Sequence, residues 1–276
     1  MRLAVNYSPQ AARLLAGGRI RFDLFKCPNW PHVIDEAARQ HPVYVHFDFR
    51  AGRGVPGDTD WSQVDRMLAA TETTHVNTHL GPSVLDFDGM SLRTTDPGDR
   101  ARLLDAAVSD VEELCRRFGA DRVAVENLMW VPDPPWAIPA LALEPRFIRD
   151  AVHATGAALV LDLAHARISA RRLELDEREY IAALPTESLC ELHVTGLRLD
   201  DAGLWKDHFP LREAGWDVAR WALDRIRAGE WARPWVLAFE YGGVDVPEIY
   251  RADDAVLAEQ VPRLLQLVRA AGGRGD

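Results

Sequence analysis

The sequence predicts an α/β protein that folds as a single TIM (β/α)8 barrel, in which eight parallel strands alternate with helices. Three observations support this fold class. Eight short apolar runs, of the kind that buried parallel strands give, recur along the 276 residues. Most of these runs are followed by a segment whose apolar residues have helical spacing. No linker divides the chain, so we expect one barrel domain over residues 1–271 and a flexible tail over residues 272–276.

The predicted strands are short and rich in aliphatic residues, as a barrel wall requires. In chain order they cover residues 3–7, 22–27, 43–48, 76–80, 123–127, 159–162, 190–194 and 235–240. The predicted helices cover residues 33–39, 64–70, 102–118, 147–154, 180–184, 218–226 and 256–270. The clearest is 102–118, where Leu103, Ala107, Val111 and Leu114 share one face and Gly119 ends the helix.

The competing α/β fold is a doubly wound sheet, which usually has a glycine-rich phosphate-binding turn after its first strand. Here the first run ends in Asn6-Tyr7-Ser8-Pro9 and has no glycine at that point. One G-x-G-x-x-G string does occur, at Gly52, Gly54 and Gly57, but Pro56 removes a backbone donor that a phosphate cradle needs. We interpret this string as a flexible loop.

The composition excludes several classes of protein. The chain has 42 acidic and 32 basic residues and a formal net charge of -10, which disfavours nucleic acid as a partner. Cys27, Cys115 and Cys190 are far apart and form no C-x-x-C pair, so neither a disulfide framework nor a zinc knuckle is indicated. No apolar run approaches the roughly 20 residues of a membrane helix, and the N-terminus lacks a signal-peptide core. We therefore expect a cytoplasmic protein.

The residues that carry chemistry lie at the C-terminal ends of the third to eighth predicted strands. Because these ends meet at one rim of a TIM barrel, such residues come together at the mouth. They are His46, His79, Glu126, Asp162 with His165, His193 and Glu240. Imidazole and carboxylate ligands suit Zn, Fe(II) or Mn(II). Seven ligands exceed the need of one ion and suffice for two if Glu126 bridges them. We expect Asp48 and Asn77 to orient His46 and His79.

The order of these residues resembles the metal site of xylose-isomerase-like barrels, which include AP endonucleases, sugar isomerases and epimerases. A closer similarity is to the multinuclear non-heme iron-dependent oxidative enzyme family. It is carried by residues 161–165, 176–185 and 191–196, together with His79-Leu-Gly-Pro-Ser83 and Glu126-Asn127. The motifs are short, and their order and spacing cover nearly the whole chain.

The resemblance implies how the ligands divide among iron ions. His46, His79 and Glu126 would hold one iron, whereas Glu126, Asp162, His193 and Glu240 would hold a second. His165 and His208 would hold a third ion or line the substrate pocket. Related sites have an Asp two residues before the last histidine, where this chain has Lys206, and Asp207 is adjacent instead. We therefore favour two ions over three, and zinc or manganese remains open as the metal.

The resemblance implies an oxygenase or oxidase that modifies a small peptide or small molecule, with a separate protein presenting the peptide. Glu126, Glu240 and Lys26, the last at the end of the second predicted strand, are the catalytic candidates. The substrate-binding candidates are Asn127, Arg198, Lys206 and Arg212. We expect substrate choice to depend on two loops, at residues 130–139 and 197–209.

Three alternatives remain open at this point. The first is a metal-dependent sugar or sugar-phosphate isomerase or epimerase, in which a carboxylate moves a proton. The second is an AP-endonuclease-type phosphodiesterase, which the net charge disfavours. The third is a barrel that binds a regulatory partner through Trp130, Trp136, Trp205 and Trp216.

Overall fold

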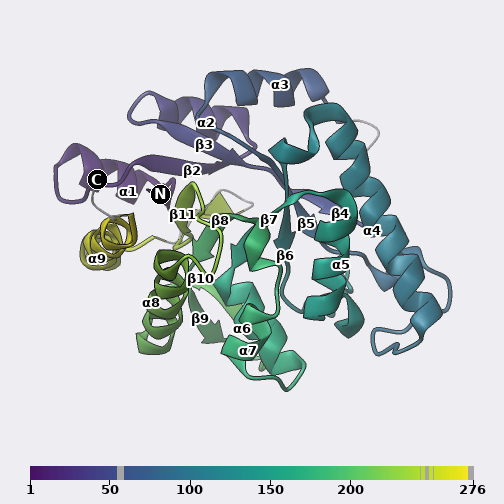
Figure 1. Ribbon diagram of the computed structural model, residues 1–276. Coiled ribbons are helices and arrows are strands. Elements are labelled where there is room, and N and C mark those ends of the chain that lie inside the picture. The colour runs from purple at the N-terminus through teal and green to yellow at the C-terminus, as the bar shows by residue number, and fades with distance from the viewer. Residues whose placement is uncertain (55–58, 243, 246–248, 251, 273–276) are drawn as a thin grey trace. The chain divides into compact units, whose positions relative to one another are not determined.

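The computed structural model describes residues 1–54, 59–242, 244–245, 249–250 and 252–272 (Figure 1). The chain forms two compact units. Unit 1 consists of Met1–His46, Ser62–Thr74 and Glu191–Asp276, and unit 2 consists of Phe47–Trp61 and His75–Cys190. Each unit is built from parallel strands and helices, so both have the α/β character that the sequence predicts.

The sheet of unit 1 has the strand order β3-β2-β1-β11-β8, and its neighbouring strands are parallel. The strands are β1 (Arg2–Asn6), β2 (Leu24–Pro28), β3 (Val43–His46), β8 (Leu189–Val194, whose first two residues are in unit 2) and β11 (Val236–Phe239). Parallel strands are buried on both faces, which explains their continuous apolar runs. Ala4, Leu24, Tyr44, Val236 and Ala238 pack into one core cluster of this sheet.

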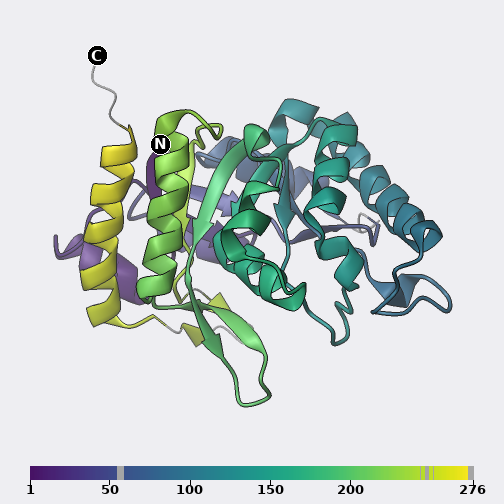
Figure 2. The ribbon, with the colours of Figure 1, turned by 60° about the horizontal axis from the view of Figure 1, so that its bottom comes forward.

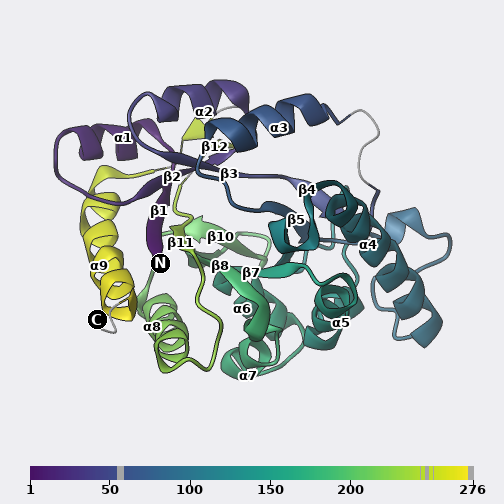
Figure 3. The same cartoon turned by 45° about the horizontal axis from the view of Figure 1, so that its top comes forward.

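Five helices belong to the described part of unit 1. They are α1 (Pro9–Ala16), α2 (Pro31–Ala38), α3 (Trp61–Ala70, whose first residue is in unit 2), α8 (Glu213–Ala228) and α9 (Asp254–Gly272). The helix α9 packs against α1, α8 and β1, and Figures 1 and 2 show α8 and α9 side by side. Figure 3 shows α2 beside β2 and β3, which it contacts. The outer helices thus cover the apolar strands that the sequence predicts to be buried.

A β-hairpin follows β8, where the sequence predicts a loop over residues 197–209. Its antiparallel strands are β9 (Gly196–Leu199) and β10 (Trp205–Phe209), and Figure 2 shows them extending past the end of α8. The loop prediction was wrong because charged and exposed side chains such as Arg198 and Lys206 hide the alternation that marks a strand. A second small pair, β12 (Val244–Asp245) and β13 (Ile249–Tyr250), is also antiparallel.

The sheet of unit 2 has the strand order β7-β6-β5-β4, and its neighbouring strands are parallel where their register is given. The strands are β4 (Phe49–Ala51), β5 (Val76–Leu80), β6 (Val123–Asn127) and β7 (Ala158–Asp162). Its helices are α4 (Pro97–Phe118), α5 (Pro145–Thr155), α6 (Leu163–Arg172) and α7 (Glu177–Ala182). Short 3-10 helices cover Val84–Asp86, Ala120–Arg122, Ala140–Leu143 and Thr186–Ser188. The helix α4 packs against α5, and α6 packs against α7.

The third predicted strand is shorter than expected, and β4 was not predicted. The strand β3 ends at His46, although the sequence predicts a strand through Asp48. The side chain of Asn77 accepts a hydrogen bond from Phe47 N at 2.7 Å and donates one to Phe47 O at 2.8 Å. These bonds replace the ladder bonds that a neighbouring strand would supply, so the backbone leaves the strand at this point.

Two helices were missed for different reasons. The helix α6 begins directly after β7, and its residues 163–170 are all buried, so it lacks the polar face that marks an amphipathic helix. The helix α1 begins soon after β1, with Ser8 as its N-cap and Pro9 at its first position, and this start signal was not used in the prediction. Residues 130–139 contain no helix or strand, as predicted for a long loop.

The glycine string forms a loop whose donors face a carboxylate. Gly52 and Gly54 have φ values of +98° and +81°, and both N–H groups donate to Asp110 Oδ2, at 2.7 and 2.8 Å. Pro56 and Gly57 lie outside the described residues. Of the predicted tail, Gly272 is the last residue of α9, and residues 273–276 also lie outside the described residues. Among the described helices, none is both long and apolar enough to cross a lipid bilayer.

The N-terminal cap of α4 provides a test of the local stability of unit 2. Asp96 accepts hydrogen bonds from Gly98 N at 2.7 Å and Asp99 N at 3.1 Å. We expect Asp96→Ala to lower the free energy of unfolding by about 1 kcal/mol, because two backbone donors lose their partner. The control Asp105→Ala changes an exposed aspartate within the same helix and should shift it by less than about 0.5 kcal/mol. Equal effects of the two substitutions in urea denaturation would contradict the capping role.

Candidate metal centre

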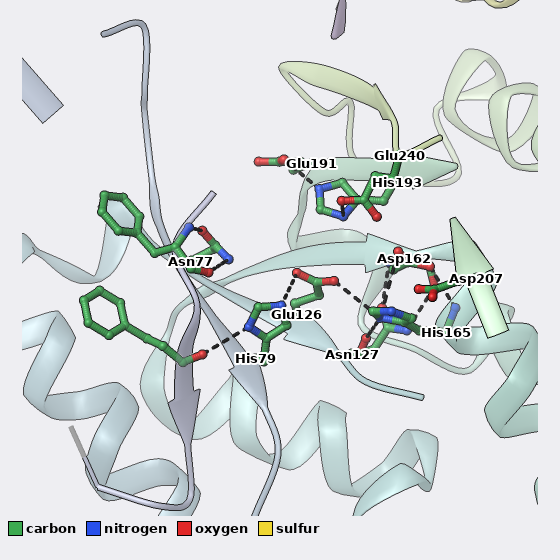
Figure 4. Close-up of polar contacts among 12 residues, drawn as sticks. Asn77, His79, Glu126, Asn127, Asp162, His165, Glu191, His193, Asp207 and Glu240 are labelled. Atoms are coloured by element: carbon green, nitrogen blue, oxygen red, sulfur yellow. Dashed lines mark hydrogen bonds and ion pairs between the residues drawn. The ribbon is translucent and has the colours of Figure 1, made fainter. Parts of the chain in front are cut away.

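In unit 2, the carboxylate of Glu126 lies between two imidazoles (Figure 4). Glu126 and His79 are register partners on β6 and β5, so their side chains lie on the same face of the sheet. Glu126 Oε2 is 3.5 Å from His79 Nε2, and Glu126 Oε1 is 3.4 Å from His165 Nδ1. Each oxygen of a carboxylate that is only 1% exposed therefore faces its own histidine.

The Asp162-x-x-His165 motif is both a helix cap and a pair of potential ligands. Asp162 ends β7 and is the N-cap of α6, and its Oδ1 accepts a hydrogen bond from His165 N at 2.8 Å. The capping geometry places the His165 ring one turn into the helix, with Nδ1 3.9 Å from Asp162 Oδ2. Glu126, Asp162 and His165 offer ligand atoms that all lie within 4.8 Å of one another.

Main-chain carbonyls orient the imidazoles of unit 2. His79 Nδ1 is 3.2 Å from Phe49 O, and His165 Nδ1 is 3.0 Å from Asn127 O. A carbonyl only accepts hydrogen bonds, so it favours the tautomer with a proton on Nδ1 and leaves the lone pair on Nε2. For His79 this free nitrogen, Nε2, is also the one that faces Glu126, so it is the nitrogen through which His79 would bind a metal ion.

Asn127, which the sequence predicts to contact substrate, joins the ends of two strands. Its amide donates to Asp162 O at 3.0 Å and accepts from Asp162 N at 2.9 Å. Asn77, predicted to orient His79, bonds to the main chain of Phe47. Asp48 is exposed just beyond the end of β3.

In unit 1, His193 links two carboxylates. His193 Nε2 donates to Glu191 Oε1 at 2.7 Å, and His193 Nδ1 is 3.2 Å from Glu240 Oε1 (Figure 4). Tyr44 donates its hydroxyl to the same oxygen of Glu191, also at 2.7 Å. The ring centroids of His46 and His193 are 5.2 Å apart. Together with Glu191, these two histidines offer ligand atoms that lie within 4.8 Å of one another.

Lys26 is part of this buried cluster. It lies in the middle of β2, two residues before the strand ends, where the sequence predicts it at the strand end. Its ammonium donates to Glu240 Oε1, and both side chains are almost fully buried. The ammonium of Lys26 therefore compensates the negative charge of the buried Glu240.

The pKa values of Glu240 and Glu191, two buried carboxylates of unit 1, both lie below their ordinary values. Burial alone would raise the pKa of Glu240, but the charges of His193 and Lys26, the hydrogen bond from His193 and the charge of His208 together hold it well below its ordinary value. For Glu191, burial raises the pKa, whereas the hydrogen bond and charge of His193 lower it further than burial raises it. Ionised, buried carboxylates beside imidazoles are suited to bind a cation.

Sequence reasoning missed Glu191. It stands two residues before His193 on β8, and residues at positions i and i+2 of a strand lie on the same face. The Glu-Leu-His spacing was therefore a usable signal for a carboxylate that orients the histidine.

The other predicted residues lie on the β9–β10 hairpin and at the start of α8. His208 lies in β10 with φ +63°, and its Nε2 is 3.6 Å from Asp207 Oδ2. The guanidinium of Arg198 stacks on Phe209 at 4.1 Å, and Lys206 Nζ is 3.8 Å from Asp200. Arg212, at the N-terminus of α8, is exposed, as are Arg198 and Lys206.

The donor set is made of imidazole nitrogens and carboxylate oxygens in both units. A model of the RiPP precursor modification enzymes MbnB/TglH/ChrH matches residues 30–232. The chain belongs to this family. The match confirms the multinuclear non-heme iron-dependent oxidative enzyme family that the ligand order predicts. A UPF0276 protein of Acaryochloris marina is 23% identical over 196 residues, which are 70% of this chain and 69% of the relative.

Solved structures with low sequence identity share the fold of this MbnB/TglH/ChrH family member. A D-psicose 3-epimerase structure is 12% identical and superposes with a TM-score of 0.58 over 99% of this chain and 100% of the epimerase. A family 2 AP endonuclease from Brucella melitensis is 16% identical, with a TM-score of 0.55 over 95% and 98% of the two chains. The predicted fold class, a xylose-isomerase-like TIM barrel, is thereby confirmed.

The buried ion pair of unit 1 can be tested in the metal-free protein. We expect Lys26→Met to lower the free energy of unfolding by about 3–5 kcal/mol, because it leaves the charge of Glu240 without its ammonium partner. Lys206→Met is the matched control, since it removes the exposed lysine of the hairpin and should cost at most about 1 kcal/mol. Adding Glu240→Gln to Lys26→Met should recover part of the loss in chemical denaturation. Equal effects of the two lysine substitutions would contradict this account.

The contact between Glu191 and His193 makes a second prediction for this unit. Carboxylates that hold a ligating histidine raise its basicity and fix its tautomer, so we expect Glu191→Gln to weaken metal binding by about 10–100-fold. Affinity would be measured by competition with a chromophoric chelator. Glu187→Gln is the control, because Glu187 makes a similar contact of 2.9 Å with the exposed His153. Unchanged affinity would refute the orienting role, and complete loss of the ion would make Glu191 a ligand.

Proposed function

We propose that the protein is a multinuclear non-heme iron enzyme that oxidises a side chain of a small peptide. Its family is described as modifying precursor peptides, and this description supports the substrate class. The observation that carries the proposal is the environment of Glu126, a buried carboxylate whose two oxygens face two different histidines. That arrangement fits a carboxylate that bridges two cations, and nitrogen and oxygen donors without thiolate suit iron.

We assign metal binding to residues of both units. In unit 2 the proposed ligands are His79, Glu126, Asp162 and His165, and in unit 1 they are His46, His193 and Glu240. His208 joins them or lines the substrate pocket. We favour two ions over three, because Lys206 replaces the acidic residue of related sites and its ammonium would oppose a third cation. When bound, iron supplies the redox chemistry that an oxygen-dependent oxidation requires.

The protein's own groups prepare the site for this chemistry. Lys26 and His193 keep Glu240 ionised in the absence of an ion, so the carboxylate is ready to accept one. The main-chain carbonyls that hold Nδ1 of His79 and His165 fix the direction in which each lone pair points. A pre-oriented, buried donor set reduces the reorganisation that metal binding and catalysis require.

We propose that the exposed basic residues Arg198, Lys206 and Arg212 meet the peptide or the protein that presents it. All three lie on the β9–β10 hairpin or at the start of α8. Positive charges at a rim steer an acidic partner and raise its association rate more than its final affinity.

A metal-dependent sugar epimerase is the second candidate. The observation that favours it is the pair of buried carboxylates Glu126 and Glu240, one of which could move a proton next to a carbonyl while a metal ion orients the sugar oxygens. Such a reaction consumes no oxygen, and this difference separates the two candidates in one assay.

We expect anaerobically purified protein to hold about two equivalents of iron and to consume oxygen when a substrate peptide is added. Glu126→Gln should lose iron and abolish oxygen uptake, because a neutral amide bridges two cations poorly. The control Glu113→Gln, an exposed residue of α4, should keep both. Metal content would be measured by elemental analysis and oxygen uptake with an electrode.

Two results would overturn the proposal. Stoichiometric zinc without iron-dependent oxygen uptake would exclude an oxidase. Isomerisation of a sugar with Mn(II), independent of oxygen, would establish the epimerase instead.

A further inference from the structure

Arg50 lies beside the histidine of the unit 2 cluster, although the sequence did not mark it as functional. It is the middle residue of β4, and its register partner on β5 is His79. Register partners in a parallel ladder present their side chains to the same face of the sheet. The side chain of Arg50 therefore lies on the face that carries His79 and Glu126.

Trp136 holds the guanidinium of Arg50 in place. The guanidinium carbon of Arg50 lies 3.3 Å from the centroid of the Trp136 ring, and that ring meets the His79 ring edge-on with centroids 6.5 Å apart. The main chain at Trp136 is fixed, because its backbone N–H donates to Asp133 O at 3.0 Å. The indole ring itself lies close to Gly81, where an added Cβ would be 3.6 Å from it. Stacking on an aromatic face leaves the N–H donors at the edge of a guanidinium free to bind in its plane.

The charge of Arg50 is not matched by an ion pair in the part of the chain that the structure describes. Burial and the nearby charge of Arg53 lower its pKa, and the charge of Asp48 offsets them only in part, so the net direction is downward. Arg53, by contrast, forms an ion pair with Asp86 at 2.8 Å and also donates to Pro135 O. A half-buried cation without a carboxylate partner is costly unless a ligand supplies one.

We propose that Arg50, backed by Trp136, binds a carboxylate of the substrate peptide next to His79. The planar guanidinium offers two parallel N–H donors that match the two oxygens of a carboxylate. A carboxylate fits better than a phosphate, because a single arginine balances one negative charge and Arg53 is already neutralised by Asp86. The carboxylate fixes the peptide, so that a neighbouring atom is presented to the metal-binding face of unit 2. This role rests on the proposed function for the identity of the substrate, but the binding itself does not.

The test is a titration with small probes, followed by NMR of the arginine Nε–Hε signals. The probes are N-acetyl-triglycine with a free terminal carboxylate, N-acetyl-Gly-Glu-Gly-amide, N-acetyl-Gly-Gln-Gly-amide and inorganic phosphate. The first two separate a terminal from a side-chain carboxylate, and the third is neutral. We expect at least one carboxylate probe to shift the NMR signal of Arg50. In Arg50→Met the affinity for that probe should fall by about tenfold or more. The neutral probe should bind wild type and variant alike.

The matched control is Arg117→Met, which removes another arginine stacked on a tryptophan. The guanidinium of Arg117 lies 4.7 Å from the ring of Trp61, at the C-terminal end of α4, and should leave carboxylate binding unchanged. Trp136→Leu should weaken binding of the carboxylate probe. Arg50→Lys should retain only part of the wild-type affinity for this probe, because lysine lacks the planar guanidinium with its two parallel donors. Circular dichroism of each variant checks that it is folded.

Three outcomes would overturn the inference. They are equal binding of carboxylate and neutral probes, full affinity in Arg50→Met, and phosphate binding more tightly than either carboxylate. The titration is run on the protein as purified and again after removal of metal with EDTA, since carboxylates also bind metal ions directly. If Arg50→Met binds the carboxylate probe as tightly as wild type, both with and without metal, while iron content and oxygen uptake are unchanged, only this inference is refuted. Carboxylate binding that persists without oxygen uptake refutes only the proposed oxidase.

Discussion

The structure depends on keeping several carboxylates both buried and ionised. Transferring a charged carboxylate out of water costs several kcal/mol, so each one needs a compensating charge or hydrogen bond nearby. Glu240 has Lys26 and His193, and Glu126 has two imidazoles. Glu191 receives hydrogen bonds from Tyr44 and His193, and Asp162 receives one from a helix N-terminus. Residues that compensate these charges in the metal-free protein are therefore as important as the ligands themselves.

This requirement explains why the surrounding secondary structure is placed as it is. In the main sheet of each unit the strands are parallel, and most of the predicted ligands stand at or near the C-terminal ends of these strands. The helix α6 begins at Asp162 itself, so one aspartate ends β7, caps the helix and remains available as a ligand. Main-chain carbonyls of Phe49 and Asn127 then select the tautomers of His79 and His165. The local fold thus sets the direction of each donor before any ion binds.

Fold similarity alone leaves the chemistry open. Epimerases and endonucleases share this barrel at identities of 12% and 16%, and folds of this kind host many unrelated reactions. The family match and the environment of Glu126 favour peptide oxidation. Arg50 adds a cationic contact beside the same histidine, and the stacked Trp136 makes that contact directional.

The sequence by itself determined the fold class, the strands 76–80 and 123–127 and the family, because apolar runs and the spacing of ligands are local properties of the chain. It also marked His79, Glu126 and Asp162, since polar residues at the ends of apolar runs are visible without a structure. Only the tertiary structure decided that Lys26 is buried against Glu240, that Glu191 holds His193, and that Arg50 stacks on Trp136. Lys26 and Glu240 are 214 positions apart, and Arg50 and Trp136 lie on different elements, so no local pattern reports their contact. The sequence did not predict the end of β3 or the start of β4 either, because the Asn77 amide that interrupts the strand comes from another part of the chain.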